Sequence, residues 1–91
     1  MLAVLLYQSA DDIMESAPRH YSAHRAYALQ KHAEGVLLMI GTFADPVTDG
    51  AMGVLVSEDS AHDFAQSDPF VLNGVVKSYR VLGWAESLTQ N

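Results

Sequence analysis

Two residues far apart in the sequence, His24 and Asp68, offer the clearest chemistry in this chain. His24 lies in an amphipathic stretch that follows Pro18, and Asp68 comes just after a second helical stretch. A carboxylate can fix the tautomer of a histidine, and the imidazole can then move a proton near pH 7. If the fold brings the two side chains together, they form an acid–base dyad.

Each of these residues also has a simpler interpretation. His24 could hydrogen-bond a backbone carbonyl on a helix face, and Asp68 could cap the turn that begins at Pro69. His20 and His24 have a spacing that could place two metal ligands on one helix, with His62 or Asp68 as a third. Because no further ligand motif accompanies them, two partly exposed histidines are the favoured interpretation, and no metal is predicted.

Other residues with reactive or binding side chains give weaker signals. The serines lack the glycine pattern of a nucleophile elbow, and no glycine-rich motif that cradles phosphate is present. Four aromatic residues could line a pocket for an aromatic substrate or belong to the core or a dimer interface: Tyr7, Phe43, Phe70 and Trp84. For Trp84 the core or the interface is favoured.

Composition limits the classes of function. The chain has 91 residues, no cysteine and a net charge of −6, and its five basic residues form no cluster. This composition argues against nucleic acid and anionic membranes as partners and fits a soluble, cytoplasmic protein without disulfides. Because 49% of the residues are apolar in so small a chain, some apolar surface is expected to face another subunit, which predicts a homodimer or higher homo-oligomer.

The hydrophobic pattern predicts the elements that must position these residues. Strands that are apolar on both faces suit the centre of a sheet, and Gly35, Asp68 and Pro69 are typical of helix ends. Strands are expected at residues 2–7, 36–40, 51–56 and 75–84, helices at 18–34 and from a cap at 57–60 to about 66, a short turn at 69–72 and a frayed polar tail at 87–91.

The predicted order is β-α-β-β-α-β, which is the ferredoxin-like arrangement of an α+β fold. Its four-stranded antiparallel sheet carries both helices on one face, and residues 1–91 form one domain. No element remains to cover the other face. A second copy packed sheet to sheet would cover it.

The chain resembles the YCII-related family of the dimeric α+β barrel superfamily. The resemblance rests on the first strand, on His24, on the segment 33–41 with Gly35 and Gly41, and on the segment 67–70 with Gly74. It implies that a histidine–aspartate pair, here His24 and Asp68, lies in a cleft beside the sheet. Relatives include a hydrolytic dehalogenase of a chlorinated hydroxyquinol and enzymes that isomerise lactones.

Two positions depart from the family pattern. Tyr21 stands where members often carry an arginine, and Thr42 stands where a proline often follows the glycine after the second strand. Arg19 or Arg25 could replace the arginine, although either would point elsewhere on the helix. These departures affect the expected anion binding and the pocket shape and leave the dyad intact.

The combined expectation is a small, cofactor-independent enzyme that acts on a small polar or aromatic molecule. His24 and Asp68 would be catalytic, with hydrolytic dehalogenation or lactone isomerisation as the reaction types. Four residues are expected to bind the substrate: Tyr7, Arg19, Gly41 and Phe70. A non-catalytic binding or regulatory module of the same fold is the alternative, and it would need the cavity without the His–Asp contact.

Overall fold

The computed structural model describes residues 1–89 as four strands and four helices. The predicted tail at 87–91 lies partly outside the described residues, because Gln90 and Asn91 are not among them. In chain order the elements are β1 (Leu2–Ser9), α1 (Ile13–Ala33), β2 (Leu37–Thr42), α2 (Pro46–Asp49), β3 (Ala51–Leu55), α3 (Glu58–Ser67), α4 (Pro69–Leu72) and β4 (Val76–Trp84).

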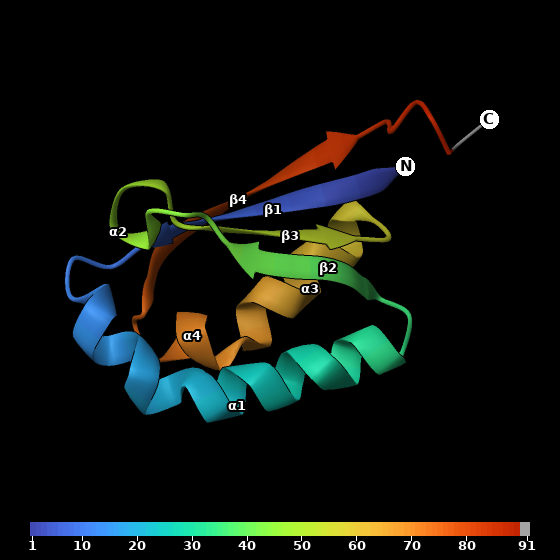
Figure 1. The fold of residues 1–91 in the computed structure, drawn as a ribbon. Helices are drawn as coiled ribbons and strands as arrows, with labels where there is room; N and C mark the ends of the chain where they lie inside the picture. Colours follow the sequence, from blue (N-terminus) through green and yellow to red (C-terminus); the bar gives the residue numbers. More distant parts are fainter. Residues whose placement is uncertain (90–91) are drawn as a thin grey trace.

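The sheet is four-stranded and antiparallel, with the strand order β2-β3-β1-β4. The helices α1, α3 and α4 lie together on one face of it (Figure 1). This arrangement confirms the predicted ferredoxin-like α+β fold. β1 is central, and its residues Ala3, Leu5 and Tyr7 are buried in alternation with less buried neighbours, as expected for a strand with one face against the helices.

The largest difference from the predicted elements is the start of α1. The helix begins at Ile13, five residues before the expected start at Pro18. The carbonyl of Asp12 accepts the backbone N–H groups of Glu15 and Ser16, so the first turn forms upstream of the proline. Pro18 then lies inside the helix, where it removes one backbone donor. The first turns of α1 run at an angle to the rest of the helix (Figure 1).

The connection between β2 and β3 contains the short helix α2 where only turns were expected. Asp45 caps this helix by accepting the N–H of Thr48, and Gly50 ends it with φ of 73°. A Cβ at Gly50 would collide with the carbonyl oxygen of Tyr7. Glycine is therefore needed here both for the positive φ and for the close approach to β1.

The core fills the space between the sheet and its helices. Leu5, Leu37, Leu55 and Phe64 are the largest fully buried side chains of this core, and none is more than 2% exposed. Within residues 1–89, no helix has the length and apolar character needed to cross a membrane.

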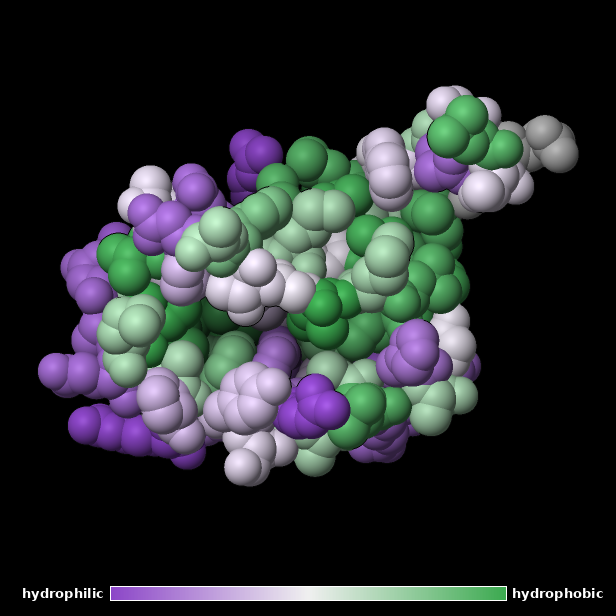
Figure 2. Space-filling view, viewed as in Figure 1, coloured by the Kyte–Doolittle hydropathy of each residue, from purple (hydrophilic) through white to green (hydrophobic). Residues whose placement is uncertain are grey.

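The opposite face of the sheet has no helix on it and is also apolar. The strand register places Leu6 beside Met52 and Val4 beside Leu82, so these side chains share that face. Met39 is 64% exposed. Hydrophobic residues are accordingly visible over the strands in the space-filling view (Figure 2).

Candidate active site

His24 and Asp68 meet between α1 and the junction of α3 with α4. The Nδ1 atom of His24 lies 2.8 Å from Oδ1 of Asp68. The Asp68 side chain is fully buried, and that of His24 is 13% exposed. The two residues are 44 positions apart in the sequence, so their contact depends on how α1 packs against α4.

The local sequence explains why Asp68 is held rigidly. A residue before proline avoids the helical conformation, and aspartate is a favoured N-cap, so Asp68-Pro69 ends α3 and starts α4. The Oδ1 atom of Asp68 accepts the backbone N–H of Phe70 at 3.0 Å. Its Oδ2 atom accepts the hydroxyl of Tyr7 at 2.7 Å. With His24, three donors from three elements therefore converge on one buried carboxylate.

The surroundings of His24 define its ring plane and its tautomer. The ring stacks on Phe70 with a centroid separation of 3.9 Å and an interplanar angle of 3°. Because a carboxylate only accepts hydrogen bonds, Nδ1 of His24 carries the hydrogen that points at Asp68. In the neutral ring, Nε2 then keeps a lone pair. That nitrogen is the atom of the pair that is available to take a proton from a ligand.

The contact between Tyr7 and Asp68 also fixes the protonation of Tyr7. Burial of the hydroxyl, and then the nearby charge of Asp68, raise the pKa of Tyr7 well above its ordinary value. Tyr7 therefore stays a neutral donor through the physiological range. Burial followed by the charge of Asp68 raises the pKa of Tyr27 as well, and its hydroxyl donates to the Phe64 carbonyl at 2.9 Å.

Two adjoining cavities open beside the dyad, with volumes of about 340 Å³ and about 520 Å³. In the space-filling view the surface is hollowed between β2 and α1, and hydrophobic residues form the walls (Figure 2). The two cavities share a set of lining residues that includes His24 and its stacking partner: Tyr7, Tyr21, His24, Thr42, Ala51 and Phe70. The dyad therefore lies where the cavities join.

Most of the residues expected to bind the substrate line these cavities. Tyr7 and Phe70 line both, and Gly41 lines the smaller one. A Cβ at Gly41 would meet nothing within 4 Å, so the fold itself does not require glycine there. Arg19 is exposed and lines neither cavity, whereas Arg25 lines the smaller one. The expected role of Arg19 stays a prediction that the geometry does not support.

Three features of the site were missed by the sequence interpretation. These are the hydrogen bond from Tyr7 to Asp68, the position of Arg25 in the cavity wall, and that of His32, which was taken as a surface residue. His32 is exposed, and its Nδ1 lies 2.8 Å from the carbonyl oxygen of Leu37. The helical spacing of Arg25 and His32, seven residues apart, was the available signal for a shared face.

The alternative metal site is not assembled in the described part of the chain. Among residues 1–89, no three histidine, aspartate or glutamate side chains are grouped as metal ligands would be. His62 is in edge contact with the ring of Tyr79, at a centroid separation of 6.3 Å. It is therefore not part of the His24 site.

Comparison with known proteins identifies the family. A model of the YCII-related domain matches residues 1–85. The chain belongs to this family. Among curated proteins, none is significantly similar in sequence. One solved structure with a similar fold is that of 5-chloro-2-hydroxyhydroquinone dehydrochlorinase (TftG) from Burkholderia phenoliruptrix AC1100, in complex with 2,5-dihydroxybenzoquinone. It is 21% identical to this chain, with a TM-score of 0.78 and full coverage of both chains. This likeness confirms the fold.

Proposed function

We propose that this YCII-related protein is an enzyme in which His24 and Asp68 perform acid–base chemistry on a small polar or aromatic molecule. The observation that carries the proposal is the 2.8 Å contact of Nδ1 of His24 with a fully buried carboxylate, at the junction of two cavities. A binding module needs a cavity, but it does not need a buried carboxylate that fixes the tautomer of a cavity histidine.

In this proposal each residue of the site has a defined task. Nε2 of His24 takes a proton from a hydroxyl group of the substrate or from water, and Asp68 stabilises the resulting imidazolium. Tyr7 donates to Oδ2 of Asp68 and Phe70 stacks on the His24 ring, so both position the dyad. Tyr7 and Phe70 also line the cavities and would contact the ligand there.

The reaction types within range are halide release and lactone isomerisation. The structural relative is a dehydrochlorinase of a chlorinated hydroxyhydroquinone. A reaction of that type removes one proton and one chloride ion from the substrate and needs no oxidant. His24 first moves a proton from one ring hydroxyl to the chlorine-bearing carbon, which turns that hydroxyl into a carbonyl. Loss of a second hydroxyl proton to His24 then forms the second carbonyl, while chloride leaves with the electron pair of the C–Cl bond. No step in this scheme calls for a cofactor.

The test is a turnover assay on chlorinated hydroxyquinols and small lactones, each with and without a carboxylate substituent, with chloride release and absorbance as readouts. We expect His24→Gln and Asp68→Asn to lower kcat by at least about 100-fold. The matched control is His62→Gln, which removes a histidine from outside the cavities. Wild-type rates in the His24 and Asp68 variants would refute the dyad. Binding of these compounds without any turnover would favour the regulatory module.

A readout independent of any substrate is the tautomer of His24. Two-bond ¹H–¹⁵N spectra of the neutral ring should show the hydrogen on Nδ1 in the wild type, because Asp68 accepts it. Asp68→Asn should shift the population toward the other tautomer, since the amide can also donate. An unchanged tautomer in this variant would contradict the assigned role of Asp68.

We also propose that the protein forms a homodimer through the uncovered face of its sheet. The support is the apolar character of that face, where Leu6 and Met52 lie with no helix over them and where Met39 lies by its pairing with Val54. Analytical ultracentrifugation should give a dimer for the wild type and a monomer for Leu6→Asp. A monomeric wild type at micromolar concentration would rule out this assembly.

A further inference from the structure

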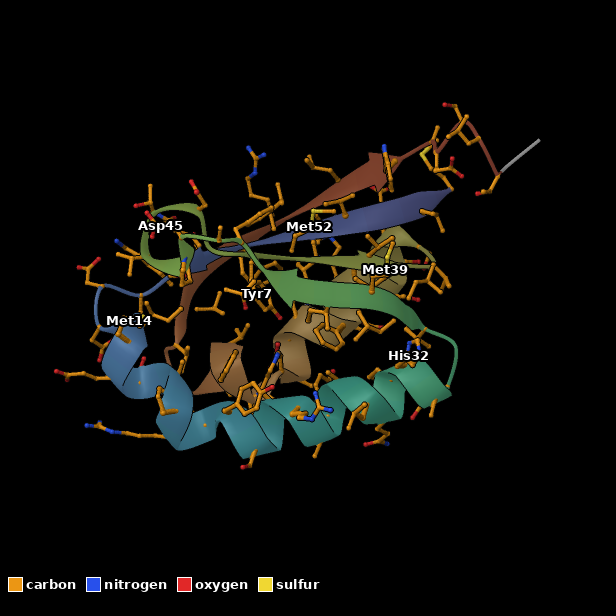
Figure 3. All side chains as sticks on the ribbon, in the orientation of Figure 1. Tyr7, Met14, His32, Met39, Asp45 and Met52 are labelled. Atoms are coloured by element: carbon orange, nitrogen blue, oxygen red, sulfur yellow. The ribbon has the colours of Figure 1, made fainter. Side chains whose placement is uncertain are left out.

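The cavities follow the length of α1, and their two ends differ in chemistry. The larger cavity extends toward Met14 in the first turns of α1, and the smaller one extends toward His32 near its last turn. Met14 and His32 lie at opposite ends of the helix (Figure 3). Tyr7 points from β1 toward the space between them, where the dyad lies (Figure 3).

Apart from the buried Asp68 behind His24, the charge that lines these cavities is opposite in sign to the charge of the whole chain. The chain has 11 acidic and five basic residues, yet within residues 1–89 no aspartate or glutamate lines either cavity. Arg25 is the one lysine or arginine of the described chain that does so. The ion pairs formed within the described residues do not include Arg25. Its guanidinium is therefore available to an anion.

A second polar side chain accompanies Arg25 at this end of the site. His32 lies seven residues further along α1, which places it on the same side of the helix two turns away. Tyr21, one turn before Arg25, and Thr42 at the end of β2 line both cavities, so they lie between this end and the other one. Arg25 and His32 thus form a cationic and hydrogen-bonding end, the Arg25 end.

The other end of the site has no charged side chain among the described residues. Its walls are mainly apolar and come from α1, from α2 and from the start of β4: Ile13, Met14, Ala17, Pro18, Pro46 and Val75. The cavity volume there, about 520 Å³, lies within the range of cavities that hold whole drug-sized ligands. A single small ring would leave much of this apolar surface uncovered.

We infer that the ligand of the dyad is an organic carboxylate with an extended apolar part, held with its carboxylate at Arg25 and its apolar part against Met14. A guanidinium in a cavity without competing acids favours a carboxylate, which it can bind through two parallel hydrogen bonds. The middle of such a ligand lies beside His24. This inference rests on the proposed function and specifies the substrate class of the same site.

The test measures binding of three probes by calorimetry or NMR titration: 4-butylbenzoate, the uncharged 4-butylbenzamide, and benzoate, which lacks the apolar tail. The wild type should bind 4-butylbenzoate at least about tenfold more tightly than either of the others. Arg25→Gln should abolish the preference for the carboxylate over the amide, and Arg25→Lys should restore part of it. Because Arg25 is exposed, these variants should fold as the wild type does.

Arg19→Gln provides the matched comparison, because it removes the same charge from an exposed position of the same helix outside both cavities. It should keep the wild-type preference. Equal binding of amide and carboxylate by the wild type, no binding of 4-butylbenzoate, or loss of the preference in Arg19→Gln but not in Arg25→Gln would each overturn the inference.

The probe measurement and the turnover assay can fail separately. If the carboxylate preference depends on Arg25 while His24→Gln changes no reaction rate, the ligand class stands and the catalytic proposal falls. If turnover depends on His24 while amide and carboxylate bind equally, the enzyme stands and the carboxylate inference falls.

Discussion

The chain contains two Asp-Pro dipeptides, and each begins a helix of four residues. Asp45 precedes α2 and Asp68 precedes α4, and both side chains accept a backbone N–H from the helix that they cap. Asp45 is exposed to solvent, whereas Asp68 is fully buried and also accepts hydrogen bonds from Tyr7 and His24. The same local sequence thus gives a surface cap in one place and the centre of a candidate active site in the other.

This difference arises from the packing around each cap. α4 is packed against both α1 and α3 on the covered face of the sheet, so the Asp68 carboxylate is removed from water and must be paired within the protein. α2 lies in the loop between β2 and β3 (Figure 1). There, the backbone N–H of Thr48 donates to the carboxylate of Asp45, which is exposed to solvent. A motif of two residues therefore predicts the cap, and the tertiary contacts decide whether the cap can also do chemistry.

The strongest test of this comparison is to truncate both caps. Asp68→Ala should lower the free energy of unfolding by about 3 kcal/mol, because it leaves the Tyr7 hydroxyl and Nδ1 of His24 without their buried acceptor. Asp45→Ala removes an exposed cap and should have a much smaller effect. Urea denaturation measures both. Equal losses would mean that the local cap, and not the buried network, accounts for the contribution of Asp68.

The next effect separates the hydroxyl of the buried Tyr7 from that of the partly buried Tyr27. Tyr7→Phe removes a donor to a buried carboxylate and should cost about 2 kcal/mol of unfolding free energy. Tyr27→Phe removes a donor to the Phe64 carbonyl, a neutral acceptor, and should cost about 1 kcal/mol. If the Tyr27 variant proves the less stable of the two, the hydrogen bond to Asp68 is not the stronger one.

The fold could be predicted from the sequence because its strands and helix ends are encoded locally. Continuous apolar runs marked the strands, and Gly35 and Asp68-Pro69 marked helix ends that the structure confirms within one or two residues. The start of α1 could not be placed in this way. Pro18 is favourable at a first turn, but the structure tolerates it further inside the helix, where it costs one hydrogen bond.

The candidate site could be predicted only in part. The pairing of His24 with Asp68 was expected from residue types and family resemblance. The hydrogen bond from Tyr7 to Asp68, in contrast, joins residues 61 positions apart and has no local signal in the sequence. Arg25 lines a cavity and Arg19 does not, which follows from helix geometry. Six residues correspond to about 120° around a helix, so the two arginines face different directions, and only packing tells which direction is the cavity.

The loss of unfolding free energy at alkaline pH should report on the environment of Tyr7. Because its pKa is raised in the folded state, the unfolded chain releases this proton first, near pH 10. The contribution of Tyr7 is fully present below that pH and falls as pH rises further, by at most about 1.4 kcal/mol per pH unit. Unfolding measured from pH 9 to 12 should be less pH-dependent in Tyr7→Phe. Tyr27→Phe should give a separate reduction, because the pKa of Tyr27 is raised too. The same slope in wild type and Tyr7→Phe would argue against a buried, neutral Tyr7.

The smallest effect concerns Asp45. Hydrogen bonds from the side chain and the backbone of Thr48 lower the pKa of Asp45. A lowered pKa in the folded state stabilises the protein above the unfolded-state pKa of about 4, and this contribution is lost as pH falls through the folded value. Asp45→Asn keeps a good cap without the charge, so it should be slightly less stable than the wild type at pH 7 and equal to it at pH 2. If Asp45→Asn instead costs as much at pH 7 as Asp68→Asn, then solvent exposure does not separate the two Asp-Pro caps, and the distinction between surface cap and buried site fails.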